Sequence, residues 1–140
     1  MNFPGAEESD VEEVPIVDSG DMVKARQKVR TSAQLHRLSL VDQTKLVTAA
    51  SELARNTLVY GGGGVMRASV LTRSGKRGIK IQFVDSGPGI PDLDLALTDG
   101  WTSGQGMGLG LSGARRLVDD FDVVSAPGAG TTVTVVKWTR

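Results

Sequence analysis

Hydrophobic residues recur along this chain with two different periods. The longer period, of about 3.6 residues, predicts two long helices. Residues 21–38 and 41–59 each carry one apolar stripe at helical spacing. Asp18 or Ser19 is placed to cap the first helix, and the four glycines at 61–64 are placed to end the second. The stripes consist of Met22, Ala25, Val29 and Ala33 in the first helix and of Leu46, Ala50, Leu53 and Thr57 in the second.

The shorter period, an alternation of apolar and polar residues, predicts strands. Residues 65–72 and 79–84 alternate on either side of Arg-Ser-Gly-Lys-Arg-Gly, which is typical of an antiparallel hairpin. Residues 14–17 are expected to form a short strand at a sheet edge, because Pro15 has no N–H to donate to a neighbouring strand.

The C-terminal part of the chain adds a third helix and two further strands. Helical spacing predicts the helix over 111–121, and residues 123–124 and 131–138 predict strands around a Pro-Gly-Ala-Gly turn. This order of elements predicts an α+β two-layer sandwich, in which a mixed, mostly antiparallel sheet carries three helices on one face.

Charge is distributed unevenly, although the formal net charge is zero. Residues 1–21 hold seven acids and no base, so residues 22–140 carry 16 bases against nine acids. The first 12 residues show no apolar period and are predicted to be a disordered acidic tail, and residues 13–140 to be one domain. The basic body suits a polyanionic ligand or an acidic partner, although an ordinary solvated surface explains the charge equally well.

Composition disfavours several classes of function. The chain has no cysteine and a single histidine, His36, which disfavours thiolate metal sites, histidine zinc sites and Ser-His-Asp triads. It shows neither a membrane-spanning run nor a signal peptide, so a cytoplasmic protein without a membrane partner is expected. Direct nucleic-acid binding is not expected, because the bases are spread over several elements and only six residues are aromatic.

A glycine at every second position marks residues 104–110, Gly-Gln-Gly-Met-Gly-Leu-Gly, directly before the third predicted helix. A P-loop is excluded because no lysine lies between Lys80 and Lys137. The match of 108–113 to a dinucleotide fingerprint lacks the βαβ unit that this motif requires. The run is interpreted as a lid whose backbone N–H groups surround phosphates, and a flexible linker is the alternative.

Three polar side chains are candidates for chemistry. Glu52 and Asn56 lie four residues apart, hence on one flank of the second helix, where a proton acceptor would stand beside an oxygen ligand for Mg²⁺. Asp85 ends a predicted strand before Ser-Gly-Pro-Gly and could accept hydrogen bonds from an amino-bearing base. Taken singly, a solvated surface pair and an ordinary aspartate turn explain these residues as well.

Taken together and in order, four segments resemble the N, G1, G2 and G3 boxes of the GHKL ATPases. They are Ser-Glu-Leu-Ala-Arg-Asn (51–56), Asp-Ser-Gly-Pro-Gly-Ile (85–90), the glycine run (104–110) and Gly-Ala-Gly-Thr (128–131). The resemblance covers roughly residues 13–138. Within the superfamily, Tyr60-Gly61, the segment 115–122 and Lys137-Trp138 look most like the RsbT-type switch kinases, whereas anti-sigma factors usually have a histidine near the position of Tyr60.

The resemblance implies a serine/threonine protein kinase of a partner-switching, stressosome-type module that uses ATP and Mg²⁺. Its substrate would be a STAS-domain antagonist or scaffold protein, and the released kinase would activate a downstream phosphatase or another effector. The alternative is an anti-sigma factor, or a nucleotide-dependent binding switch without significant kinase activity. The resemblance leaves open whether the protein is a homodimer.

It also assigns roles to residues. Glu52 would accept the hydroxyl proton, Asn56 would hold Mg²⁺, and Asp85 would pair with the adenine amino group. Arg55 is expected to point away from Glu52, so no cation for the γ-phosphate is identified. The implied nucleotide-binding residues are Asn56, Asp85, Gly87, Gly89, Ile90, Gly104, Gly106, Gly108, Leu109, Gly110 and Thr131.

Overall fold

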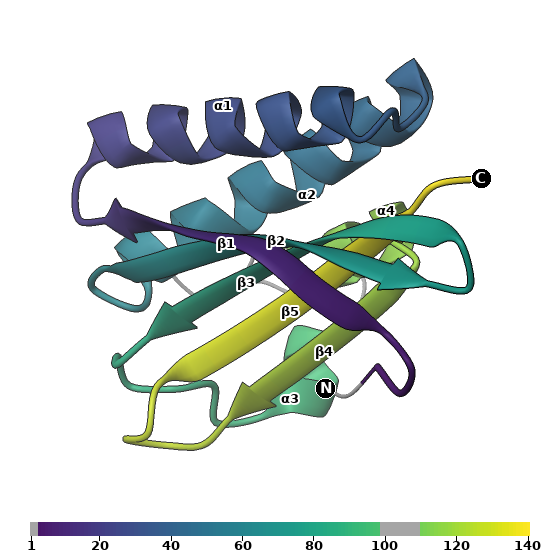
Figure 1. The fold of residues 1–140 in the computed structure, drawn as a ribbon. Coiled ribbons are helices and arrows are strands. Elements are labelled where there is room, and N and C mark those ends of the chain that lie inside the picture. The colour runs from purple at the N-terminus through teal and green to yellow at the C-terminus, as the bar shows by residue number, and fades with distance from the viewer. Residues whose placement is uncertain (1–2, 99–109) are drawn as a thin grey trace.

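A computed structural model describes residues 3–98 and 110–140, which form a sheet layer and a helix layer (Figure 1). The described part of the chain has five strands and four helices. In chain order they are β1 (Glu7–Ile16), α1 (Ser19–Leu35), α2 (Leu40–Val59), β2 (Gly64–Arg73), β3 (Lys76–Asp85), α3 (Leu93–Ala96), α4 (Leu111–Leu117), β4 (Asp120–Ser125) and β5 (Thr131–Trp138). The predicted α+β two-layer fold is confirmed.

The sheet has the strand order β1-β2-β3-β5-β4, and all its described strand pairs are antiparallel. Its register aligns residues from four strands at one end. Gly64 pairs with Asp85, Asp85 with Thr131, and Thr131 with Ser125. This row brings segments that are distant in sequence to the sheet end where the candidate site lies.

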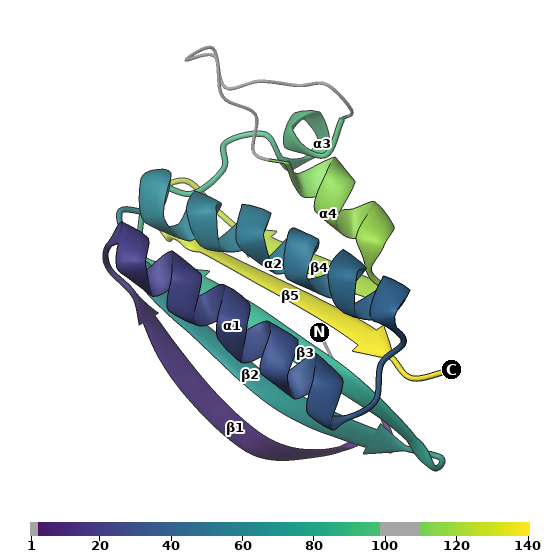
Figure 2. The ribbon, with the colours of Figure 1, turned by 90° about the horizontal axis from the view of Figure 1, so that it is seen from above.

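Helices α1 and α2 cover one face of the sheet, and α4 lies beside α2 (Figure 2). The sequence stripes face the core as predicted, since Ala25, Val29 and Ala33 of α1 are buried and so are Leu46 and Leu53 of α2. Asp18 begins α1 with a capping box: its side chain accepts from the N–H of Asp21, whose side chain accepts from the N–H of Asp18. None of the described helices is long and apolar enough to cross a membrane.

The structure corrects the prediction for the N-terminus. Residues 1–12 were expected to be disordered, but β1 begins at Glu7 and pairs with β2 along its length, apart from a bulge between Ser9 and Glu12. The segment joins the sheet through its backbone pairing with β2, and several acids of β1 also contact cations. Glu8 lies 3.0 Å from Lys80, Glu13 lies 2.8 Å from Arg67, and Glu12 pairs with Lys28 of α1.

The third predicted helix is shorter than its apolar period suggested. Helix α4 ends at Leu117, and Phe121 lies in β4. The backbone N–H of Asp119 donates to the carbonyl of Val136 on β5 at 2.9 Å, so the chain joins the sheet directly after the helix. A period alone could not separate the last helical turn from the first residues of a half-buried strand.

Candidate functional site

A cavity of about 310 Å³ opens between the C-terminal part of α2, the loop after β3 and the start of α4. Ligand pockets in proteins typically measure about 300 to 1,000 Å³, so this cavity is large enough for part of a nucleotide. Its walls are mainly apolar, and three polar side chains predicted from the sequence reach it: Asn56, Asp85 and Thr131. They come from α2, β3 and β5.

Asp85 stands where β3 ends, in the register row between Gly64 and Thr131. Its Oδ1 accepts a hydrogen bond from the N–H of Gly87 at 2.9 Å, which fixes the carboxylate at the start of the following loop. A Cβ at Gly61 would lie 2.6 Å from Asp85 Oδ2, so only glycine leaves that oxygen its space. The carboxylate is thus held between the end of α2 and its own loop.

Gly87 lies where two backbones meet: a Cβ there would lie 2.7 Å from the Cα of Gly61. It does not line the cavity, and its predicted contact with nucleotide stays a prediction. The two glycines therefore permit a close approach of two backbones, which joins the end of α2 to the loop after β3. Gly61 and Tyr60 both line the cavity, and the sequence reasoning had used them only as a helix stop and a subgroup marker.

Gly89 and Ile90 line the cavity, and β4 and β5 hold their loop in place. Gly89 has a φ of +78°, and a Cβ there would clash with the carbonyl oxygen of Ala126. The backbone N–H of Ile90 donates to Ser125 Oγ at 2.7 Å, and Ser125 Oγ lies 2.8 Å from Thr131 Oγ1. The hydroxyl of Ser125 thus connects the loop to Thr131.

Ser125 escaped the sequence reasoning because a serine at a strand end belongs to none of the recognised motifs. Thr57 escaped it for another reason. It was assigned to the apolar stripe of α2, and it is buried there, with its hydroxyl donating to the carbonyl of Leu53 at 2.9 Å, but it also lines the cavity.

Glu52 lies one helical turn before Asn56, next to the start of α4. A Cβ at Gly110 would lie 2.6 Å from Glu52 Oε2, and Gly110 has a φ of +66°. Leu111, the first residue of α4, lines the cavity. Glu52 and Gly110 therefore meet close to the cavity, although neither belongs to its lining.

The expected direction of Arg55 is wrong. Arg55 Nη1 lies 3.8 Å from Glu52 Oε2, as a pair three residues apart on α2. The Glu52 side chain is 45% exposed, so solvent screens this ion pair strongly. Its importance lies in bringing a cation to the flank that carries Glu52.

Of the nucleotide-binding residues predicted from the sequence, the structure brings Asn56, Asp85, Gly89, Ile90 and Thr131 to one cavity. Gly104, Gly106, Gly108 and Leu109 lie outside the described residues, so their predicted contacts with phosphates remain predictions.

The residues that are present fit a magnesium nucleotide in chemical terms. Asp85 offers a carboxylate hydrogen-bond acceptor at the cavity, where the glycines around it leave its oxygens accessible. The apolar walls, which include Phe83, Ile90 and Leu111, suit the faces of a flat aromatic base. The carboxamide of Asn56 can supply one oxygen ligand to Mg²⁺, an ion that commonly takes its other ligands from phosphates and water.

Comparisons with known proteins point the same way. The family described as "Histidine kinase-, DNA gyrase B-, and HSP90-like ATPase" matches residues 41–139. A Bacillus subtilis (strain 168) protein named serine/threonine-protein kinase RsbT is 42% identical over 127 residues, which cover 91% of this chain and 96% of that protein. An anti-sigma F factor from Thermoanaerobacter sp. (strain X514) is 29% identical over 97 residues, which cover 65% of this chain and 66% of that protein.

A solved structure also resembles the fold. It contains the RsbU and RsbW domains of a Mycobacterium tuberculosis protein, and it matches with a TM-score of 0.59 and 17% sequence identity. The match covers 92% of this chain and 32% of that longer one. At this identity the likeness concerns the fold alone.

Proposed function

Because the chain belongs to the histidine kinase-, DNA gyrase B- and HSP90-like (GHKL) ATPase family, and within it to the RsbT-type serine/threonine kinases, we propose that its substrate is a STAS-domain protein. In this proposal the γ-phosphoryl group of ATP passes to a serine or threonine hydroxyl of that protein. The observation that carries the nucleotide part of this proposal is the convergence of Asn56, Asp85 and Thr131, from three separate segments, on one cavity of about 310 Å³.

The adenine would occupy the apolar part of the cavity. Asp85 would accept a hydrogen bond from its amino group, and the hydroxyl of Thr131, which lies 2.8 Å from Ser125 Oγ, would face the same base. The site distinguishes bases through this carboxylate, since guanine offers a carbonyl oxygen where adenine offers the amino group. Replacement of Asp85 therefore tests nucleotide binding directly.

The phosphates would extend toward Asn56 and the start of α4. Bound Mg²⁺ would neutralise charge on the phosphates, and Asn56 would hold it from α2. Gly110 keeps the backbone at the start of α4 close to Glu52, and the glycines before it are proposed to donate N–H groups to the phosphates. Phosphoryl transfer depends mainly on positioning and charge neutralisation, so a small set of such groups is sufficient.

Glu52 would accept the proton of the attacking hydroxyl. Its side chain is partly exposed, as a group that must meet an incoming protein has to be, and its neighbour Arg55 would orient it. The partner's hydroxyl would enter beside α2, between Glu52 and the phosphates. Once phosphorylated, the STAS-domain protein would release the kinase to act on a phosphatase or another effector.

Two substitutions separate the proposed roles. Glu52→Ala is expected to change Mg-ATP affinity less than about threefold and to lower the transfer rate about a hundredfold or more, because general-base catalysis contributes about 10² to 10⁴. Asp85→Asn keeps the shape of the side chain but is expected to weaken Mg-ATP binding about tenfold or more, since a polar partner of the base is lost. Calorimetry measures binding, and labelled ATP with a STAS-domain substrate measures transfer. Equal loss of binding in both variants would contradict this division.

A binding switch is the second candidate, and the 29% identity to an anti-sigma F factor favours it. In that case the protein would form a complex with its partner in the presence of Mg-ATP and leave the partner's serines and threonines unmodified. Mass spectrometry of the partner after incubation distinguishes the two functions, because only the kinase adds the mass of a phosphoryl group.

A further inference from the structure

Two segments that the proposed function leaves without a role, 115–122 and 137–138, meet at the end of the sheet opposite to the cavity. The backbone N–H of Trp138 donates to Asp119 Oδ2 at 2.7 Å. The indole N–H of the same tryptophan donates to Asp120 Oδ2, also at 2.7 Å. The chain that leaves α4 is therefore fastened to the end of β5 by side chains as well as by the sheet.

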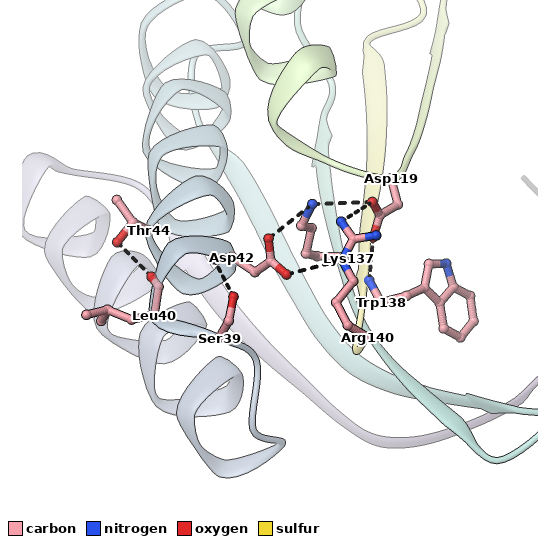
Figure 3. Close-up of polar contacts among 8 residues, drawn as sticks. All are labelled: Ser39, Leu40, Asp42, Thr44, Asp119, Lys137, Trp138 and Arg140. Atoms are coloured by element: carbon pink, nitrogen blue, oxygen red, sulfur yellow. Dashed lines mark hydrogen bonds and ion pairs between the residues drawn. The ribbon is translucent and has the colours of Figure 1, made fainter.

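A buried lysine lies at the centre of this junction (Figure 3). Lys137 Nζ is 3.5 Å from Asp42 Oδ1 in the first turn of α2 and 3.3 Å from Asp119 Oδ1 after α4. Arg140 approaches both aspartates at 3.5 Å from the solvent side. We call these four residues, Asp42, Asp119, Lys137 and Arg140, the Lys137 cluster.

Burial makes the Lys137 cluster unusual for charged residues. Lys137 is only 3% exposed and Asp42 only 5%. Burying an ion pair costs desolvation free energy, which its attraction often fails to exceed, so such a pair is a poor device for stability alone. Removing either partner of a buried ion pair leaves an uncompensated charge, so the arrangement of the elements that carry the pair is sensitive to change. Lys137 links three elements through contacts of this kind.

The three elements are those that define the edge of the proposed phosphate site. Helix α4 packs against α2 (Figure 2). Its first end is next to Glu52, whose Oε2 would lie 2.6 Å from a Cβ at Gly110. The chain just beyond its other end, at Asp119, is tied through Lys137 to Asp42, which lies ten residues before Glu52 on α2. Helix α4 therefore runs antiparallel to α2, with its first end next to Glu52 and the chain beyond its other end linked to Asp42.

We propose that Lys137 is a positioning residue for phosphoryl transfer, which bridges Asp42 and Asp119 to hold α4 along α2 and so sets the approach of Gly110 to Glu52. The inference rests on the role of Glu52 in the proposed function. The Lys137 cluster lies at the N-terminal end of α2, far from the cavity. The inference therefore predicts that a change in the cluster lowers the rate of transfer more than it lowers nucleotide affinity. The adenine end of the cavity is built from α2, β3 and β5 and does not depend on the position of Asp119.

The test compares variants of the full chain. Asp119→Asn keeps the shape of the side chain and leaves the pair of Lys137 with Asp42, and Lys137→Met removes the bridge. Lys80→Met is the matched control, because Lys80 lies in the same sheet and its ion pair is with Glu8 of β1, at 3.0 Å. Hydrogen exchange of residues 111–117, Mg-ATP affinity and transfer to a STAS-domain protein that the wild type phosphorylates are measured for each.

Both cluster variants are expected to raise exchange in 111–117 about tenfold relative to α1, to lower kcat about tenfold, and to change the Kd for Mg-ATP less than about threefold. Lys137→Arg, which keeps the charge, should recover part of kcat, and Lys80→Met should change none of the three. If Lys137→Met does not fold, Asp119→Asn decides the question.

An unchanged kcat and unchanged exchange in 111–117, with only a lowered melting temperature, would show that the Lys137 cluster merely closes the fold. Equal losses of kcat and nucleotide affinity would also overturn the proposal. If the wild type transfers no phosphate to any STAS-domain protein, the proposed function fails and with it the catalytic part of this inference. Hydrogen exchange still decides in that case whether Lys137 holds α4.

Discussion

The two ends of α2 have different surroundings: glycines and an apolar cavity lie at one end, and buried charged residues lie at the other. At its C-terminal end, Gly61 lets the backbone approach the loop after β3, and an apolar cavity with a few polar groups lies open. At its N-terminal end, Asp42 is buried in the Lys137 cluster and pairs with Lys137 at 3.5 Å. One end presents polar groups to a cavity, and the other end pairs its charges with one another.

The difference shows how one helix serves both binding and fixation. Close backbone contacts at the glycine end depend on the absence of side chains, so added atoms are expected to be harmful there. The charged end depends on complete pairing, so removed charges are expected to be harmful there. Substitutions that add atoms should therefore be most harmful at the C-terminal end of α2, and substitutions that remove charges should be most harmful at its N-terminal end.

The largest effect is expected at the charged end. Lys137→Met leaves two carboxylates without their buried cation, and breaking such a pair costs about 3 to 5 kcal/mol of unfolding free energy. Lys80→Met removes a more exposed pair and should cost at most about 1 kcal/mol. Urea unfolding of both variants measures the difference. Equal losses would mean that burial does not distinguish the two lysines.

At the glycine end, Gly89→Ala and Gly128→Ala form a matched pair. Both residues have a φ near +78°, but a Cβ at Gly89 would clash with the Ala126 carbonyl, whereas nothing lies within 4 Å of one at Gly128. The left-handed backbone alone should cost Gly128→Ala about 1 to 2 kcal/mol, and the clash should add about 1 to 3 kcal/mol in Gly89→Ala. Only Gly89→Ala is expected to weaken Mg-ATP binding, and calorimetry checks this.

A smaller effect is expected for Ser125→Ala. The change removes the hydroxyl that accepts from the N–H of Ile90 and contacts Thr131, so it should cost about 1 to 2 kcal/mol and lower Mg-ATP affinity several-fold. Ser51→Ala removes a hydroxyl that donates to the helix carbonyl of Val47 at 2.8 Å, and it should stay within about 0.5 kcal/mol of the wild type. Thermal unfolding and calorimetry test both. Equal behaviour would remove Ser125 from the site.

The smallest effect concerns pH and lies away from both ends of α2. The hydrogen bond from Ser69, and after it Lys80, lowers the pKa of Glu8. A carboxyl whose folded pKa is lowered stabilises the protein above its unfolded pKa of about 4.3, and this stability is lost as pH falls through the folded value. Glu8→Gln should therefore flatten the acid side of the curve of melting temperature against pH. Ser69→Ala should reproduce part of that change, and a curve parallel to the wild type in both variants would contradict it.

Local patterns predicted much of the fold from the sequence. The apolar stripes of α1 and α2 appear as expected, because burial of one face enforces the period that the sequence shows. The hairpin of β2 and β3 also formed around its glycine turn. The cavity residues Asn56, Asp85 and Thr131 were found because they belong to motifs whose order along the chain is informative.

The parts that were missed depend on contacts between distant residues. The acids of β1 looked like a solvated tail, since two of the cations that pair with them, Arg67 and Lys80, lie more than 50 positions away on β2 and β3. The sequence does not predict the contact among Asp42, Asp119 and Lys137, because each is an ordinary charged residue in its own segment. The hydrogen bond between Ser125 and Ile90 depends on the register of the strands, which cannot be read from the sequence.

The register of the β2–β3 hairpin fixes the position of Asp85 relative to the neighbouring strand. Asp85 faces Gly64 at one end, and the two-residue turn at Ser74 and Gly75, both with positive φ, closes the other. Because alternate strand residues face opposite sides, a residue inserted within β3 would rotate the carboxylate of Asp85 out of its row. Residues added at the turn would leave the carboxylate in its place. This hairpin can therefore become longer at its tip without any change in the residues that line the cavity.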